Sequence, residues 1–425
     1  MIVSSSALLY RKKILHEMAY ALDENNISTS IGDDQMSFVD VEVYMEEDVN
    51  VAVKPETNNP EENIPEENVP ENSDRPQEEN NDTVPNPPVL PEQNEDIGAG
   101  NEEEIIPDEP YEGEDRDFTF IALGEMMLGP EDATKYDFIS SFKNISEYAQ
   151  NADFTFASLS TNIVKLDKLE NVKNKYIVTA DIIKSFQTLG IDAVNVATDH
   201  MVDYSKTIFN GTIDILRDNR IDVMGLHNDV VYAENDGIKV AFIGVNNEVI
   251  GSYYKYTSHG ILMYDDYMTN LKQLISSTKE KADLVVLVTH LGFENSQTVT
   301  SVMSWFYRAL INAGADIVLG NHALGNYPIT IYNGKPIIYS LSYLVTDSKY
   351  EEAHKSGIYK FTIDVTGKLK SIEIIPVYSN SKKEVLLYTE HSLEEATQFL
   401  KYLSQKTYDG VEMKILDGKL FVKFK

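Results

Sequence analysis

Cysteine is absent from this 425-residue sequence, which excludes disulfides, thiolate metal sites and cysteine nucleophiles. Basic residues are scarce as well, because 36 Lys and Arg stand against 69 Asp and Glu and give a formal charge of −33. Phosphate binding needs clustered Lys and Arg, so we predict no nucleic-acid partner. The sequence also lacks any run of about 18 apolar residues, the length that a complete membrane-spanning helix requires.

The acidic charge is concentrated in residues 51–117, where 22 Asp and Glu stand against 3 Lys and Arg. The same segment holds 11 of the 15 prolines, and four of them recur every fifth residue at Pro55, Pro60, Pro65 and Pro70. Proline at this spacing disfavours both helix and sheet, and like charges repel one another. We therefore predict a disordered, solvated acidic linker, with a tract that binds cations or a basic partner as the alternative.

The first ten residues are followed by Arg11, Lys12 and Lys13. A signal peptide carries its positive residues before its apolar run, and ten residues are too few to span a bilayer. Two interpretations stay open for residues 1–50: a short N-terminal stub, or the end of a membrane anchor that begins upstream of Met1. Basic residues after an apolar run tend to stay in the cytoplasm, which argues against an extracellular position for the part of the chain that follows such an anchor.

From residue 118 onward, short apolar runs alternate with segments of helical periodicity. The predicted strands are 118–123, 154–157, 193–197, 240–244, 284–289, 317–320 and 337–340. The predicted helices are 181–189, 205–219, 267–281 and 298–313. This alternation indicates an α/β fold of about 260 residues.

The C-terminal sequence predicts two further strands, a helix and a hairpin. The strands span 358–365 and 370–378, the helix spans 392–404, and the hairpin turns at Asp417-Gly418. We therefore predict four parts: the stub (1–50), the acidic linker (51–117), an α/β domain (118–380) and a small α+β tail (381–425).

Carboxylate and imidazole side chains directly follow four of the predicted strands. They belong to Glu125, Asp199, His200, His290 and His322. Ligands of open α/β sheets bind where strands run out into loops. A single histidine in such a place is more often structural, but three of them beside two carboxylates suit a divalent transition metal. The other five histidines do not follow this pattern.

Six blocks between residues 117 and 347 resemble, in order, the motifs of the poly-gamma-glutamate capsule synthesis (CapA) family, a branch of the calcineurin-like metallophosphoesterase superfamily. The blocks are Gly124–Leu128, Ala152–Thr161, Leu189–Tyr204, His290–Glu294, Ala313–His322 and Gly334–Leu341. The resemblance implies two mixed β-sheets packed as a sandwich and flanked by helices, with a metal-centred site at one edge. It also implies a role in making or exporting a polyglutamate-type capsule. The protein would act at the outer face of the cell envelope, where an N-terminal anchor would tether it to the membrane.

Several positions depart from that family pattern. Glu125 replaces an aspartate, and Asp199 replaces an asparagine. The family's Asn-Leu-Glu is Ser158-Leu-Ser160, which lacks the carboxylate. Leu324 replaces the second histidine of a His-Pro-His motif, and a Ser-Leu-Gly-Asn turn has become Ser340-Leu-Ser-Tyr343. Leucine cannot bind a metal, and serine does so poorly.

The resemblance implies a role for each of the remaining site residues. Glu125, Asp199, His290 and His322 would bind a divalent Mn, Fe or Zn ion, and His200 would protonate a leaving group. Asp203 and Glu294 would orient the histidines. The alternatives for these two are a helix N-cap and a solvated loop charge. Fewer ligands remain than two ions would share, which favours one ion, a weakly bound ion or none.

Three functional hypotheses stay open at this point. The first is a capsule-synthesis protein with a metal-dependent hydrolase site of reduced ligand number. The second is a non-catalytic relative that uses the same cleft to bind an envelope polymer or its synthesis machinery. The third is a plain cell-surface interaction domain whose strand-end histidines are unrelated. The third requires that the five side chains do not converge in space.

Overall fold

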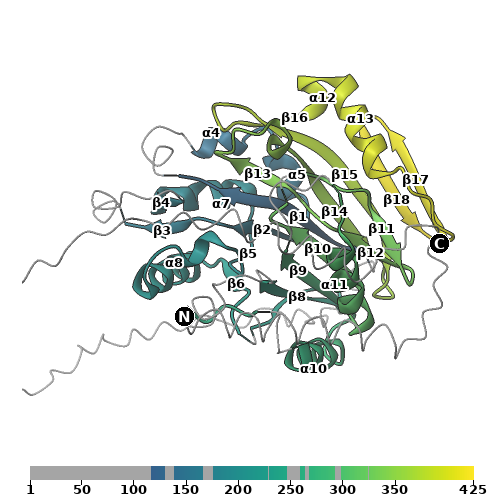
Figure 1. Cartoon of the computed structure of the whole chain (residues 1–425), viewed down its shortest axis with the longest axis horizontal. Helices are drawn as coiled ribbons and strands as arrows, with labels where there is room; N and C mark the ends of the chain where they lie inside the picture. The colour runs from purple at the N-terminus through teal and green to yellow at the C-terminus, as the bar shows by residue number, and fades with distance from the viewer. Residues whose placement is uncertain are drawn as a thin grey trace, which may run out of the picture. The chain divides into compact units, whose positions relative to one another are not determined.

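The computed structural model describes residues 116–129, 138–165, 176–227, 229–246, 259–263, 268–291, 298–323 and 325–425. The predicted stub and nearly all of the acidic linker lie outside these residues. Within the described part, two mixed sheets pack face to face (Figure 1). The fold class predicted from the sequence is therefore confirmed for this part of the chain.

The larger sheet has ten strands in the order β17-β18-β15-β14-β1-β2-β5-β6, with β13 beside β1 and β16 beside β15. Strands β1, β2, β5, β6 and β13 pair in parallel, and the others pair antiparallel. The strands are β1 (Phe118–Met127), β2 (Phe154–Leu159), β5 (Ala193–Asn195), β6 (Asp222–Met224), β13 (Tyr343–Thr346), β14 (Lys355–Ile363), β15 (Leu369–Ser379), β16 (Val385–Leu387), β17 (Val411–Leu416) and β18 (Lys419–Phe424).

The smaller sheet has six strands in the order β11-β12-β10-β9-β8-β7. Its central strands β12, β10, β9 and β8 are parallel, and antiparallel strands lie at both edges. The strands are β7 (Val231–Asn235), β8 (Ile238–Asn246), β9 (Leu284–His290), β10 (Ile317–Asn321), β11 (Thr330–Tyr332) and β12 (Lys335–Ile338). A separate parallel pair joins β3 (Asn162–Val164) to β4 (Ile177–Thr179).

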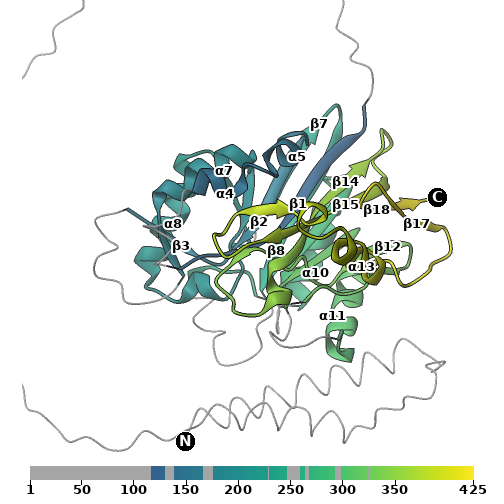
Figure 2. The same cartoon turned by 90° about the horizontal axis from the view of Figure 1, so that it is seen from above.

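Helices cover the outer faces of both sheets (Figure 2). α4 (Phe138–Phe142), α5 (Ser146–Gln150), α7 (Ile183–Leu189) and α8 (Lys206–Asp218) cover the parallel half of the larger sheet. α10 (Met268–Lys279) and α11 (Ser301–Asn312) cover the smaller sheet. The remaining helices are α12 (Tyr388–His391), α13 (Leu393–Leu403) and the short 3-10 turns η1 (Ala180–Ile182), η2 (His200–Val202) and η3 (Glu351–His354).

The apolar runs are explained by burial on both faces of the strands. In β1, Phe118 and Phe120 point between the sheets, whereas Ile121 and Leu123 point toward the helices. Alternate residues of a strand face opposite sides of its sheet, so a strand covered on both sides must be apolar throughout. The layer between the sheets is rich in phenylalanine; the ring of Phe120 stacks on Phe361 with centroids 4.5 Å apart.

Two features of the fold go beyond what the sequence predicted. The first strand does not end before Gly124 but continues to Met127, with a register shift between Leu123 and Glu125. A β-carbon on Gly124 would lie 2.5 Å from the carbonyl oxygen of Ser342, so only glycine lets β1 and the chain before β13 approach this closely. In addition, β18 pairs with β15, which makes the predicted tail (381–425) contribute strands to the ten-stranded sheet.

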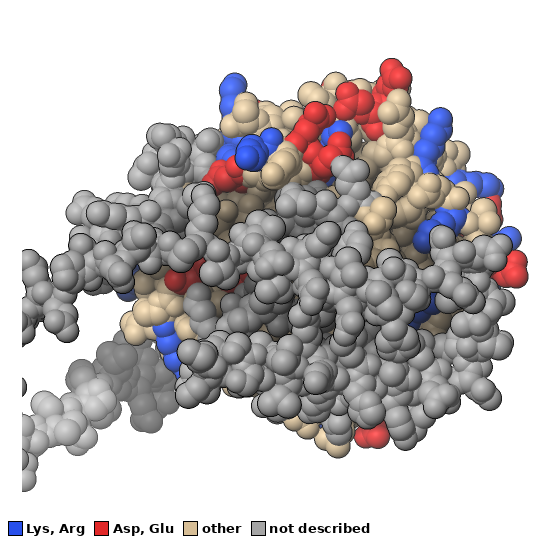
Figure 3. Space-filling view, viewed as in Figure 1, with Lys and Arg blue, Asp and Glu red and all other residues tan. Residues whose placement is uncertain are grey.

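On the coloured part of the face in Figure 3, Lys and Arg side chains lie close to Asp and Glu side chains. The absence of a nucleic-acid partner stays a prediction. Among the described residues, no helix has both the length and the apolar character needed to cross a membrane.

Candidate metal centre

The parallel strands of the two sheets bring polar side chains into two rows. In the larger sheet, Ser158 is paired in register with both Glu125 and Asn195. In the smaller sheet, His290 is paired in register with both Asn246 and Asn321. The rows contact each other, because the Asn321 side-chain amide donates a 2.8 Å hydrogen bond to the Ser158 hydroxyl. The carboxyl ends of strands from both sheets thus form one polar site.

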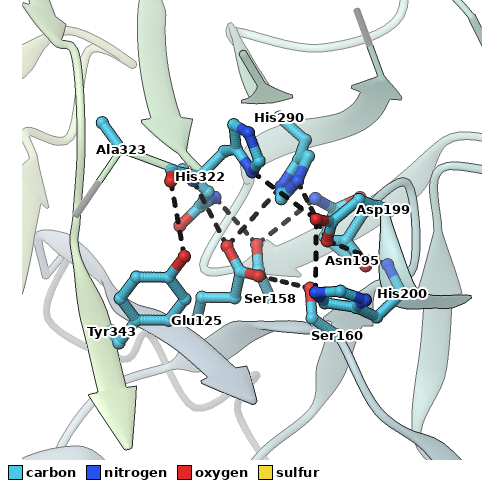
Figure 4. Close-up of polar contacts among 12 residues, drawn as sticks. Glu125, Ser158, Ser160, Asn195, Asp199, His200, His290, His322, Ala323 and Tyr343 are labelled. Atoms are coloured by element: carbon cyan, nitrogen blue, oxygen red, sulfur yellow. Dashed lines mark hydrogen bonds and ion pairs between the residues drawn. The ribbon is translucent and has the colours of Figure 1, made fainter. Parts of the chain in front are cut away.

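Asp199, His290 and His322 form the centre of this site (Figure 4). One ligand atom from each lies within 4.8 Å of the other two. Asp199 Oδ1 is 3.3 Å from His290 Nε2, and Asp199 Oδ2 is 3.7 Å from His322 Nδ1. His290 is 1% exposed, whereas the side chains of His322 and Asp199 are 14% and 15% exposed, so solvent reaches the group from the side of these two residues.

Glu125 lies next to the other edge of the His290 ring. Its Oε2 atom is 3.5 Å from His290 Nδ1 and accepts a 3.3 Å hydrogen bond from the backbone N–H of His322. Its Oε1 atom accepts a short hydrogen bond from the Ser160 hydroxyl. Glu125 is 1% exposed, so this buried carboxylate is held by three polar contacts from both sheets.

His322 has a backbone conformation that is unusual for its residue type. Its φ is +80°, in a region that non-glycine residues rarely occupy. Its N–H donates to Glu125, and its carbonyl accepts a 3.4 Å hydrogen bond from the Tyr343 hydroxyl. Strained backbone persists where surrounding contacts enforce it, and such strain is concentrated at functional sites.

His200 lies at the rim of the site, with its side chain 21% exposed. Its Nδ1 atom is 2.8 Å from Asp203 Oδ2, and its Nε2 atom is 3.4 Å from Asp199 Oδ2. The ring of Tyr176 packs against it, with centroids 3.8 Å apart. Asp203 therefore contacts His200 as the sequence suggested. The alternative of a helix N-cap is wrong, because Ser205 caps α8.

The ionisation of the site follows from these contacts. Burial opposes the charge of Asp199, but the imidazoles of His290, His200 and His322 outweigh it and hold the pKa of Asp199 well below its usual range. Burial also opposes protonation of His200, yet the hydrogen bond to Asp203 and the nearby Asp199 carboxylate raise the pKa of His200. The site thus pairs a stable carboxylate with imidazoles.

A network of uncharged groups lies behind the charged ones. The Ser158 hydroxyl accepts hydrogen bonds from the side-chain amides of Asn195 and Asn321, at 3.3 and 2.8 Å. Ser158 and Ser160 occupy positions where the resemblance led us to expect an asparagine and a carboxylate. Sequence reasoning missed Asn195 and Asn321. Their signal was a polar residue at the end of an apolar strand, which we had used only for acidic and histidine side chains.

The donor set fits a single divalent transition ion. Zn-type ions bind imidazole nitrogen and carboxylate oxygen at about 2.0–2.2 Å, which in tetrahedral geometry places donors about 3.3–3.6 Å apart. The separations of the Asp199 oxygens from His290 Nε2 and His322 Nδ1, 3.3 Å and 3.7 Å, are close to this spacing. Two imidazoles with one carboxylate also form a three-ligand set of the kind that leaves further positions open.

All five strand-end residues predicted from the sequence therefore meet in one place. Figure 4 shows the side chains of Glu125, Asp199, His290 and His322 directed toward one another, with His200 beside Asp199. This convergence argues against the hypothesis that the histidines are unrelated. Glu294, predicted to orient a histidine, lies outside the described residues.

Comparison with known proteins identifies the family of this site. The model of the bacterial capsule synthesis protein family, PGA_cap, matches residues 119–348, more than half of the chain. The capsule biosynthesis protein CapA of Bacillus anthracis is 24% identical over 328 residues, which cover 73% of this chain and 78% of the relative. The PGA biosynthesis protein CapA of Bacillus subtilis is 26% identical over 46% of this chain, and the match spans about half of that relative, 53%.

A solved structure, the NAD nucleotidase NadN of Haemophilus influenzae, superposes with a TM-score of 0.36 and 12% identity. The superposition covers 67% of this chain and 56% of the neighbour. A likeness of this strength does not indicate a shared activity.

Proposed function

The chain belongs to the bacterial capsule synthesis protein family, PGA_cap, and we propose that it acts in making or exporting an envelope polymer of the poly-γ-glutamate type. Its relatives from two Bacillus species carry names for capsule and PGA biosynthesis. We place its action at the outer face of the cell envelope, with the acidic segment 51–117 as a spacer to a membrane anchor. Its partners would be the polymer or the machinery that synthesises it.

For the site itself we propose a hydrolase centre that holds one divalent Mn, Fe or Zn ion. The observation that carries this proposal is the convergence of Asp199, His290 and His322, with ligand atoms within 4.8 Å of one another. An ion of this kind activates water and polarises a phosphoryl or carbonyl oxygen. The uncharged network of Ser158, Asn195 and Asn321 supplies no second set of anionic ligands, which supports one ion instead of two.

The protein side chains contribute binding and proton transfer. His200 is the proton donor to the leaving group, because its ring lies at the solvent rim beside Asp199 and Asp203 fixes its Nδ1 edge. The packing of Tyr176 against the same ring restricts its orientation further. His290 is buried behind the group and keeps water from reaching it on that side.

One observation favours a second candidate, a non-catalytic protein that binds polymer through the same cleft. Ser160 stands where the resemblance implies a carboxylate, and its hydroxyl is engaged by Glu125. A site that has exchanged charged ligands for hydrogen-bonded serine could keep its shape without keeping its chemistry.

The two candidates differ in a direct assay. Protein purified without chelator would be analysed for metal and tested on phosphodiester and poly-γ-glutamate substrates. His200→Gln would be tested beside it, with His391→Gln, an exposed histidine of the C-terminal part, as the control. The hydrolase proposal expects about one ion per chain and a loss of roughly 10²–10⁴-fold in activity for His200→Gln only. Fewer than about 0.1 ion per chain would overturn it.

A further inference from the structure

We propose that Glu125 is a positioning residue that orients His290, and that it does not bind the ion itself. The inference rests on the proposed single-ion site and goes beyond it by assigning a different role to a residue that the sequence suggested as a ligand. Its basis is the position of the two carboxylates at opposite edges of one imidazole ring.

The geometry of His290 separates the two carboxylates. Asp199 Oδ1 is 3.3 Å from Nε2, and Glu125 Oε2 is 3.5 Å from Nδ1. The two ring nitrogens point away from each other, so an ion bound to Nε2 together with Asp199 lies on the far side of the ring from Glu125. In agreement, the group of ligand atoms that lie within 4.8 Å of one another among the described residues contains Asp199, His290 and His322 but not Glu125.

The remaining contacts of Glu125 also suit a positioning residue. Oε1 accepts from the Ser160 hydroxyl, and Oε2 accepts from the backbone N–H of His322. The carboxylate is thus directed by protein donors on both oxygens and has the acceptor capacity to receive Nδ1–H of His290. That arrangement places the proton on Nδ1 and leaves the Nε2 lone pair facing Asp199 and His322.

The same carboxylate links two of the three ligands. Through Oε2, Glu125 contacts both the His290 ring and the N–H of His322, whose φ of +80° needs external support. Outer carboxylates that accept from a metal-binding histidine fix its tautomer and orientation, and their removal typically weakens metal binding by about 10–100-fold. We expect this size of effect from Glu125.

The test uses Co²⁺, whose visible absorption responds to the number and type of its ligands. Wild-type protein, Glu125→Gln, Glu125→Ala and Asp199→Asn would each be titrated with Co²⁺. Glu125→Gln keeps an oxygen that can accept from His290, so we expect the wild-type spectrum at saturation with a dissociation constant raised up to about tenfold. Glu125→Ala should raise it by about 10–100-fold, again with the wild-type spectrum. Asp199→Asn should change or abolish the spectrum.

A second variant and a control complete the design. Ser160→Ala removes only the hydrogen bond to Glu125 Oε1, and we expect weaker Co²⁺ binding with an unchanged spectrum. Glu373→Gln, which alters an ion pair with Lys419 far along the sheet in β15, should bind as the wild type does.

The outcomes distinguish this inference from the proposed function. If wild-type protein gives no Co²⁺ spectrum, the single-ion site is wrong and the role of Glu125 fails with it. If the wild type gives a spectrum and Glu125→Gln changes its shape as Asp199→Asn does, Glu125 is a ligand and only the positioning role is overturned. Unchanged affinity in Glu125→Ala would also overturn it.

Discussion

Asp153 links the two sheets at the start of their strands, and its replacement by asparagine tests how much this link stabilises the fold. The carboxylate precedes β2 and accepts hydrogen bonds from the Thr119 N–H in β1 at 2.7 Å and from the Asn235 amide at the end of β7 at 2.7 Å. The Thr119 hydroxyl and Arg116 donate as well, at 3.1 and 2.5 Å. Only 7% of the side chain is exposed.

The expected loss follows from these contacts. Hydrogen bonds to a charged group contribute about 1.5–3 kcal/mol. The Asp153→Asn variant keeps one acceptor oxygen but turns an N–H₂ group toward at least one donor. The ion pair with Arg116 adds little, because that side chain is 57% exposed. We therefore expect Asp153→Asn to lower the free energy of unfolding by about 2–3 kcal/mol at pH 7.

This loss should depend on pH in a defined direction. Burial opposes the ionisation of Asp153, but the hydrogen bonds from Thr119 and Asn235 outweigh it and lower its pKa in the folded protein. The stabilisation is therefore complete above the unfolded pKa of about 3.9 and is lost as the pH falls through the lower folded value. Urea unfolding at pH 7, 5 and 3 would measure this. A control, Asp229→Asn, alters an exposed ion pair with Arg217. A difference below about 0.5 kcal/mol at pH 7, or one equally large at pH 3, would refute the reasoning.

Three further predictions concern packing and the metal. Gly124→Ala should lower the free energy of unfolding, measured by urea titration, by about 1–3 kcal/mol, because its β-carbon would lie 2.5 Å from the Ser342 carbonyl oxygen. The control is Gly211→Ala in α8, whose β-carbon would meet nothing within 4 Å. This variant should be neutral or slightly stabilising. Phe242 is fully buried in the layer between the sheets, so Phe242→Ala should lower the free energy of unfolding by about 3–5 kcal/mol in thermal or urea unfolding. A loss below about 1 kcal/mol would contradict the packing of this ring between the sheets. Zn²⁺ at a concentration one hundred times its dissociation constant should raise the free energy of unfolding of the wild type by about 2.7 kcal/mol. The effect should disappear in His322→Ala. Calorimetry with and without chelator would measure both.

The strand pattern of the sheets could be predicted because burial on both faces makes these strands apolar throughout. Leu284–His290 is an example, in which an apolar run is followed by Thr289 and His290. Where such a run stops at a polar residue, the sequence also indicates the end of the sheet at which the site lies. That rule places His290 and His322 at one end of the smaller sheet and Asp199 at the end of a strand of the larger sheet, and the packing of the two sheets brings them together.

The pairing of polar groups across the two sheets could not be predicted. Ser158 and Asn321 are separated by 163 positions in the sequence and belong to different sheets, and the packing of the sheets determines that they meet. The sequence also could not indicate that Glu125 faces the Nδ1 edge of the His290 ring and Asp199 the Nε2 edge. Glu125 and Asp199 look equivalent as strand-end carboxylates, yet β1 continues through a register shift between Leu123 and Glu125, and Glu125 lies within the strand beside Nδ1.

The position of a bound ion tests the central claim most directly. Crystals of the protein soaked with Mn²⁺ or Zn²⁺ would be measured at an X-ray energy where the ion scatters anomalously. We predict a single anomalous peak per chain, in contact with an Asp199 oxygen, His290 Nε2 and His322 Nδ1, with Glu125 against His290 Nδ1. Two peaks, a peak bound by Glu125, or no peak between these three side chains would contradict the single-ion site.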